Sequence, residues 1–149
     1  MKLEFCGIIQ IINGPNLNLL GTREPSIYGN DSMEDYLNSI RKSFPDLEIR
    51  YAQSNHEGDL VDLIQACGLK NIPIILNAGA YTHTSVALAD AISASKAYVV
   101  EVHISNIFAR EEFRHNSFIS PKAVAVISGL GLFGYEAAIQ YILDKSIRG

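Results

Sequence analysis

Short apolar segments alternate along this chain with longer segments in which apolar residues recur at helical spacing. Four of the short segments are predicted to be buried strands, and they are residues 5–12, 72–77, 97–104 and 123–128. A fifth segment alternates polar and apolar side chains, which predicts a half-buried outer strand over residues 47–53. Four segments with an apolar helical face are predicted to be helices, and they are residues 32–44, 59–68, 85–95 and 135–147.

The ends of two helices carry recognisable signals. Ser32 and Asp35 form a capping-box pattern at the start of the first helix, Pro45 stops it, and Gly68 is predicted to cap the second. Five strands that alternate with helices predict a parallel sheet covered on both faces and joined by right-handed crossovers. The predicted fold class is therefore α/β: a flavodoxin-like doubly wound five-stranded parallel sheet with helices on both faces, in one domain over residues 1–149.

The composition narrows the class of protein. Of the 149 residues, 48% are hydrophobic and 19% are charged, which is typical of a soluble globular domain. The net charge is −4 and no basic run occurs, so no nucleic-acid partner is expected. Residues 5–12 are far fewer than the roughly 20 apolar residues that a membrane span needs. No small-residue cleavage site follows them, so neither a membrane association nor a signal peptide is expected.

Two cysteines add a prediction about location. Cys6 and Cys67 lie inside apolar segments and show no C-x-x-C spacing. We expect both to be buried, reduced thiols, which suits a cytoplasmic protein.

The connection after the first strand is unusually long. It reads "NGPNLNLLGTREPSIYG" over residues 13–29 and is about three times the usual length, so it is either functional or disordered. In an open α/β sheet, ligands bind beyond the carboxyl ends of the strands. Asn13, Asn16, Arg23 and Tyr28 of this loop are therefore candidates for a site, although a tyrosine on a loop is more often a packing residue.

Polar residues also follow the third and fourth strands. Asn77 ends one of them and leads to His83, while Glu101 and His103 lie two apart on the other and so share a face. Ser105 follows directly. A single histidine is more often structural than catalytic, and Asn77 has the simpler role of satisfying a turn. A buried Glu101, however, needs a partner or a function.

Other charged residues are expected to lie elsewhere. Lys70, Lys96 and Lys122 each precede a strand, at the amino end of the sheet, so no lysine is placed to form an imine with a substrate. Arg110, Glu111 and Glu112 are interpreted as an ordinary solvated face. The four histidines show no metal-binding spacing, so no metal is expected.

The sequence "GLGLFG" at 129–134 matches the glycine pattern of dinucleotide-binding loops. That fingerprint requires a further strand after the helix and an acidic residue about 20 positions on. We therefore interpret it as a tight turn that packs the last helix onto the sheet.

Several motifs together resemble the type II 3-dehydroquinases. They are the loop at 13–29, "SNHEGDLVDLIQ", "LNAGAYTHTSVALADAI" and "EVHISNIFAREEFR", with "SFISPKAVAVISGLGLFGYEAAIQYIL" completing nearly the whole chain. The resemblance implies the shikimate-pathway reaction in which 3-dehydroquinate reversibly loses water to give 3-dehydroshikimate. It implies an enolate intermediate and no cofactor. It also implies a homo-oligomer, a dodecamer built from trimers.

The resemblance further implies a role for each matching residue. Tyr28 would be the base, Arg23 would lower the pKa of that tyrosine, and Asn16 would hold a water against the enolate. His103 would be the general acid, oriented by Glu101. The implied substrate contacts are Asn77, His83, Asp90, Ile104, Ser105 and Arg114.

The chain departs from the family pattern at a few positions. Phe108 stands where many members have histidine, and His115 and Asn116 also vary, which leaves their effect on specificity and packing open. Two other functions remain possible from the sequence alone. One is a flavodoxin-like module that binds a nucleotide or flavin at the same strand ends, and the other is a purely structural subunit.

Overall fold

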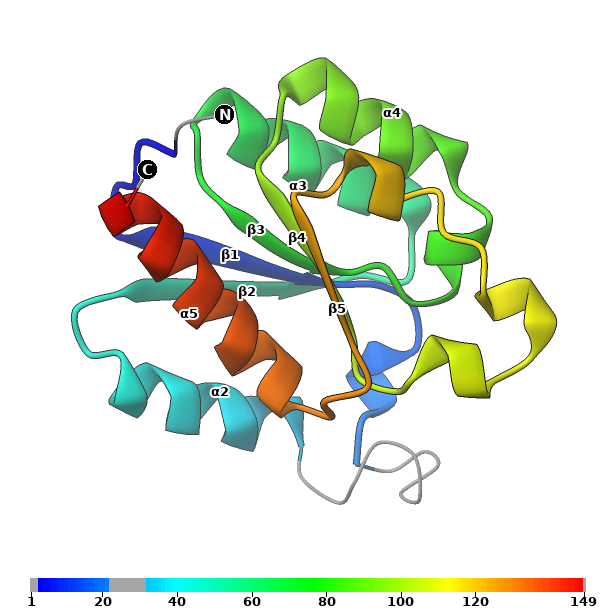
Figure 1. The fold of residues 1–149 in the computed structure, drawn as a ribbon, viewed down its shortest axis with the longest axis horizontal. Helices are drawn as coiled ribbons and strands as arrows, with labels where there is room; N and C mark the ends of the chain where they lie inside the picture. Colours follow the sequence, from blue (N-terminus) through cyan, green and yellow to red (C-terminus); the bar gives the residue numbers. More distant parts are fainter. Residues whose placement is uncertain (1–2, 22–31, 149) are drawn as a thin grey trace.

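A computed structural model describes residues 3–21 and 32–148 of the chain (Figure 1). Its five strands form one parallel sheet in the order β2-β1-β3-β4-β5. The strands are β1 (Ile8–Asn13), β2 (Glu48–Gln53), β3 (Ile74–Asn77), β4 (Val99–His103) and β5 (Ala125–Ser128). The α-helices are α2 (Met33–Ser43), α3 (Glu57–Leu69), α4 (Val86–Ser95) and α5 (Phe133–Arg148). The predicted flavodoxin-like fold is confirmed.

The helices cover both faces of the sheet, as Figure 1 shows, and each face has its own apolar core. On one face α2 and α5 pack against β1, with Leu37, Ile139 and Ile11 all buried. On the other face α3 and α4 pack against β3, with Leu60 and Leu88 among the buried residues. Buried strands with side chains on two covered faces are what the near-continuous apolar runs predicted.

Short 3₁₀ turns make up much of the connecting chain. They are η1 (Leu17–Leu19), η2 (Gly79–His83), η3 (Ile107–Ala109), η4 (Glu112–Arg114) and η5 (Ser120–Lys122). Three of these, η3 to η5, lie in the long connection between β4 and β5. Figure 1 shows this connection, residues 104–124, leaving the end of β4 and returning beside α4 to the start of β5.

Two local predictions are confirmed. The Ser32 hydroxyl caps α2 by accepting a hydrogen bond from the Asp35 backbone N–H at 3.1 Å, as the capping-box pattern indicated. The alternating segment forms β2, which lies at an edge of the sheet beside β1.

Two other predictions are wrong. Cys6 is exposed, because β1 begins only at Ile8 and the residues before it leave the sheet, whereas Cys67 is buried as expected. Gly68 does not cap α3, which continues to Leu69. A β-carbon on Gly68 would lie 2.5 Å from the hydroxyl oxygen of Ser95, so this glycine allows α3 to pack closely on α4 instead.

Candidate active site

A pocket lies where β1, β3 and β4 end, as expected for a sheet of this type. Seven of the residues predicted from the sequence line it, and they are Asn16, Asn77, His83, His103, Ile104, Ser105 and Arg114. Segments far apart in the chain therefore contribute to one cavity.

Two other predicted residues, Glu101 and Asp90, are described by the structure but do not line this pocket. Glu101 lies behind His103 rather than on the pocket wall. Asp90 is exposed on α4. Arg23 and Tyr28 fall outside the described residues, so their proposed roles stay predictions.

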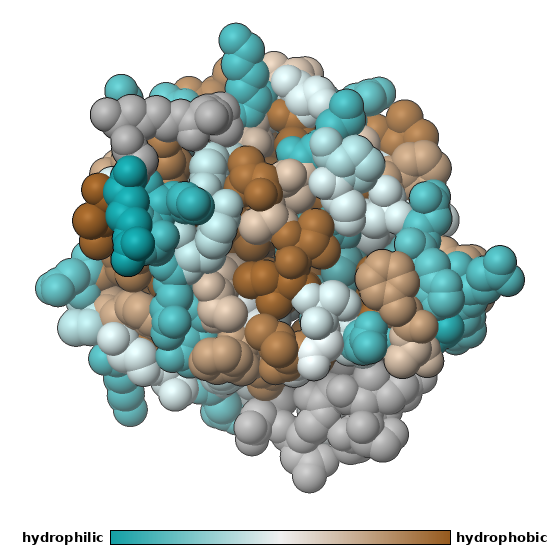
Figure 2. All heavy atoms as spheres, in the orientation of Figure 1, coloured by the Kyte–Doolittle hydropathy of each residue, from teal (hydrophilic) through white to brown (hydrophobic). Residues whose placement is uncertain are grey.

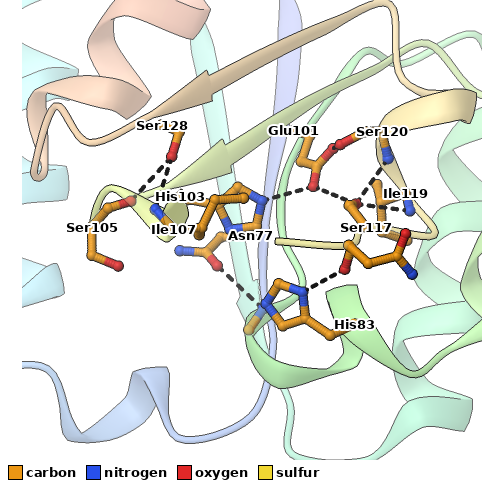
Figure 3. A network of polar contacts seen from close by, with 12 residues as sticks. Asn77, His83, Glu101, His103, Ser105, Ile107, Ser117, Ile119, Ser120 and Ser128 are labelled. Carbon is orange, nitrogen blue, oxygen red and sulfur yellow. Dashed lines mark hydrogen bonds and ion pairs between the residues drawn. The ribbon is translucent and has the colours of Figure 1, made fainter. Parts of the chain in front are cut away.

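A buried carboxylate holds the central histidine. Glu101 and His103 sit on the same face of β4, with side chains 1% and 6% exposed, and the Nε2 atom of His103 lies 2.7 Å from Oε1 of Glu101 (Figure 3). An ionised carboxylate only accepts hydrogen bonds, so Nε2 carries the hydrogen in this contact. The Nδ1 atom is then the ring nitrogen that can exchange a proton with a molecule in the pocket.

The Glu101 carboxylate has further donors. Burial alone raises the pKa of Glu101, but hydrogen bonds from His103, Ser120 and Ser117 outweigh that effect. The pKa of Glu101 therefore lies below its ordinary value, and the group is an anion at neutral pH. The buried Glu101 was expected to need a partner, and its carboxylate has three hydrogen-bond partners.

A second histidine lies beside the first. The rings of His83 and His103 are stacked, with centroids 6.3 Å apart and planes inclined by 20°. The Nδ1 atom of His83 lies 2.8 Å from the backbone oxygen of Asn116, which can only accept, so Nδ1 donates and Nε2 is left as the acceptor. Burial lowers the pKa of His83, which favours the neutral ring.

The Asn77 amide is fixed from inside the protein. Its Nδ2 atom donates to the Tyr135 hydroxyl at 3.1 Å, and its Oδ1 atom accepts from the Gly79 backbone at 3.2 Å. The same Tyr135 hydroxyl donates to Oδ1 of Asn13 at 2.7 Å. One tyrosine of α5 thus links the carboxyl ends of β1 and β3. The sequence does not predict this link, because the position of Tyr135 in the apolar pattern of α5 indicates only packing.

One wall of the pocket carries two arginines. Arg110 and Arg114 both line it, with side chains 18% and 21% exposed, and both contact Oε2 of Glu111, at 3.7 Å and 2.8 Å. Arg110 also donates to the Ser105 hydroxyl at 3.4 Å. The prediction that Arg110 belongs to a solvated face is therefore wrong, whereas Glu111 and Glu112 are exposed as expected. The 3₁₀ turns η3 and η4 fold the arginine inward, and no periodic pattern in the sequence signals them.

Two residues that depart from the family pattern contact each other near this wall. The ring centroids of Phe108 and His115 lie 5.6 Å apart, and the Nε2 atom of His115 lies 3.1 Å from the backbone oxygen of Arg110. Both residues therefore lie beside the turn that carries Arg110.

The glycines of "GLGLFG" form a turn against the end of β4. The backbone N–H groups of Gly129 and Gly131 donate to the carbonyl oxygens of His103 and Ile104, at 3.1 Å and 2.9 Å. Gly129 has a φ of +88°, which side chains rarely allow. The prediction of a tight turn before the last helix is confirmed.

Within the ranges 3–21 and 32–148, no cluster of three histidine, cysteine or acidic side chains is arranged to hold a metal ion. In the same ranges, no helix has the length and apolar character required to cross a membrane.

Comparison with known proteins identifies the class of this chain. The family described as "Dehydroquinase class II" matches residues 7–143. The "3-dehydroquinate dehydratase 1" of Agrobacterium fabrum is 52% identical over 134 residues, which cover 89% of this chain and 92% of that protein. The "3-dehydroquinate dehydratase" of Prochlorococcus marinus is 50% identical over 139 residues, covering 91% of this chain and 94% of that protein.

The solved structures agree. The crystal structure of type II dehydroquinase from Butyrivibrio crossotus superposes with a TM-score of 0.86 at 45% identity, covering 91% of this chain and 97% of that one. The type II dehydroquinase from Propionibacterium acnes gives a TM-score of 0.88 at 37% identity, covering 94% and 98%. The chain belongs to the class II dehydroquinase family, and the alternative of a nucleotide- or flavin-binding module is set aside.

Proposed function

We propose that this chain is a 3-dehydroquinate dehydratase, a hydro-lyase that converts 3-dehydroquinate reversibly to 3-dehydroshikimate. Family membership and the names of its relatives support the reaction. The observation that carries the site is the buried Glu101–His103 pair, which opens onto a pocket with a positively charged wall. Such a pair supplies a proton beside a place where an anionic substrate can bind.

The proposed reaction is an anti elimination through an enolate. A base removes a proton from the carbon next to the ketone, and an acid then protonates the departing hydroxyl. We assign the base to Tyr28. Its ordinary pKa of about 10 makes it a poor base at neutral pH. Arg23, five residues earlier in the sequence, is assigned to lower that pKa, because a guanidinium within a few ångströms lowers the pKa of an acidic group by ~1–3 units.

The acid is assigned to His103. Because Glu101 holds the hydrogen on Nε2, Nδ1 is the nitrogen that delivers the proton to the leaving hydroxyl. Glu101 also stabilises the charged ring that precedes this transfer. Asn16, at the start of η1, is assigned to hold a water against the enolate oxygen.

The substrate carboxylate is assigned to the positive wall. Among the described residues that line the pocket, Arg110 and Arg114 carry positive charge and none is acidic, so this wall favours an anionic group. Arg114 is the proposed carboxylate partner, with the backbone N–H groups near Ile104 and Ser105. Asn77 and His83 are proposed to bind substrate hydroxyl groups, and Asp90 is retained as a proposed substrate contact.

We also propose that the chain forms a homo-oligomer, with a dodecamer built from four trimers as the expected size. Its support is an apolar surface on β5, an edge strand of the sheet. Figure 2 shows hydrophobic side chains gathered over this strand. The exposed apolar residues on this strand, directly before it, and from there to the start of α5 are Val124, Val126, Leu130 and Phe133. Light scattering measures the mass directly, and a monomer would contradict the proposal.

The direct test of the reaction is ultraviolet absorbance after addition of 3-dehydroquinate. The product is a conjugated enone, whereas the substrate is not, so the absorbance rises if the chain catalyses the reaction. No rise with the folded protein would overturn the proposed function.

A further inference from the structure

Residues 116–120, which follow η4 and enter η5, contact His83 directly and reach His103 through Glu101. Asn116 contributes its backbone oxygen to His83, and Ser117 and Ser120 contribute their hydroxyl groups to Glu101, the partner of His103 (Figure 3). Neither serine has a role in the proposed reaction mechanism.

The direction of the Ser117 hydroxyl is set by its surroundings. Its oxygen accepts hydrogen bonds from the backbone N–H groups of Ile119 and Ser120, both at 3.0 Å. Both lone pairs are therefore occupied, and the hydroxyl hydrogen points to Oε1 of Glu101, 2.8 Å away. Ser117 therefore acts as a hydrogen-bond donor to Glu101.

The two serines donate to different oxygen atoms of the Glu101 carboxylate. Oε1 of Glu101 accepts from Ser117 and from His103, while Oε2 accepts from Ser120. The ionisable groups that face this carboxylate, within the described chain, are His103 on its own strand and His83 on η2. The residues paired with Glu101 on β3 and β5 are Leu76 and Val126, which are apolar. The hydroxyl groups are thus the main neutral donors that replace water around this anion.

We propose that Ser117 and Ser120 are positioning residues that hold Glu101 as an anion and thereby keep the proton of His103 on Nε2. Without them Glu101 takes up a proton at a higher pH, because a buried carboxylate with fewer donors is harder to ionise. Once Glu101 is neutral it no longer fixes the tautomer of His103. Neither serine contacts the substrate in this role.

The test uses the variants Ser117→Ala, Ser120→Ala and the double variant, in full-length protein labelled with ¹³C at glutamate side chains. The carboxyl resonance of Glu101 is assigned by its loss in Glu101→Gln and followed as a function of pH. We expect its titration midpoint to rise by about one pH unit for each hydroxyl removed. A double variant with an unchanged midpoint would overturn the proposal.

Two controls separate this role from a general effect on folding. Ser146→Ala removes a hydroxyl that donates to the Leu143 carbonyl at 2.7 Å in α5, so the Glu101 midpoint should not move. Ser120→Thr keeps the hydroxyl and should restore the wild-type midpoint. If the double variant does not fold, the single variants give the same comparison, and unchanged midpoints in both would again overturn the proposal.

The kinetic readout rests on the proposed function. With 3-dehydroquinate, the acid limb of kcat should move to higher pH in the double variant, with a loss of about tenfold at the pH one unit above the wild-type midpoint and little change in KM. A wild-type protein without activity would overturn the proposed function alone, because the carboxyl titration needs no substrate. An active enzyme with an unmoved acid limb would overturn the positioning role.

Discussion

The contact between Glu101 and His103 is the part of the site that the sequence predicts most securely. Spacing of two along a strand places both side chains on one face, and the structure joins them at 2.7 Å. The sequence does not show what keeps the carboxylate charged. Its other donors, Ser117 and Ser120, come from 16 and 19 positions away and reach it only through the turns after β4.

Replacing Glu101 with glutamine tests this charge through stability. The pKa of Glu101 is lower in the folded protein than its ordinary value of 4.5, so its ionisation stabilises the fold above that pH. The stabilisation is lost as the pH falls through the folded pKa, because the unfolded chain binds the proton first. In a glutamine at this position, the side-chain NH₂ group replaces an oxygen that accepts hydrogen bonds and so meets other donors. A buried polar group is then left unpaired, which lowers the free energy of unfolding by about 1–3 kcal/mol.

We therefore expect Glu101→Gln to unfold more easily than wild type at pH 7, and the difference to shrink below pH 4.5. Urea denaturation at a series of pH values measures it. If the difference in the free energy of unfolding stays constant with pH, the charge of Glu101 does not contribute to stability.

Tyr28 carries a second prediction at the scale of the residue. Phenylalanine keeps the ring and removes only the group that accepts the proton. Turnover by Tyr28→Phe should fall by about 100-fold or more, as expected for loss of a general base, while substrate binding persists. Steady-state kinetics with a separate binding measurement distinguish the two. Near wild-type turnover would remove Tyr28 as the base.

Among the elements, α5 does more than cover the sheet. Tyr135 is fully buried at its first turn and connects Asn13 at the end of β1 with Asn77 at the end of β3. Burial raises the pKa of this phenol well above its ordinary value, so it remains a neutral hydroxyl that donates to one amide and accepts from the other. The helix thereby fixes the orientation of an amide on the pocket wall.

Tyr135→Phe should lower the free energy of unfolding by about 1–3 kcal/mol, because it leaves the Oδ1 atom of Asn13 without its donor. It should also raise KM more than it lowers kcat, since Asn77 is then free to rotate in the pocket. Thermal or urea denaturation and steady-state kinetics test both effects. Tyr141→Phe on the same helix is the matched control, because Tyr141 does not line the pocket. Equal changes in KM for the two variants would contradict this role.

At the scale of the whole molecule, the regular alternation of strands and helices was enough to predict the fold. The rule that ligands bind at the carboxyl ends of parallel strands then placed Asn77, His83 and His103 at one cavity. Arg110 and Tyr135 escaped prediction for physical reasons. The first depends on irregular 3₁₀ turns, and the second lies on a helix whose apolar spacing gives no sign that its hydroxyl reaches a distant strand.

The placement of lysines tests the mechanism as a property of the entire fold. None of the lining residues in the described chain is a lysine, and Lys70, Lys96 and Lys122 precede strands at the opposite end of the sheet. Borohydride added together with 3-dehydroquinate should therefore leave the activity unchanged, because no imine is present to be reduced. Inactivation that depends on substrate, with a matching gain in protein mass, would contradict the enolate route.

The most direct measurement compares the initial rate of enone formation from 3-dehydroquinate by wild-type protein and by His103→Ala at the same concentration and pH. The wild type should produce a steady rise in ultraviolet absorbance. The variant, checked for an unchanged fold by circular dichroism, should be slower by about 100-fold or more, as expected for loss of a general acid. No rise with the wild type, or only a twofold difference between the two, would contradict a dehydratase that uses His103 as its general acid.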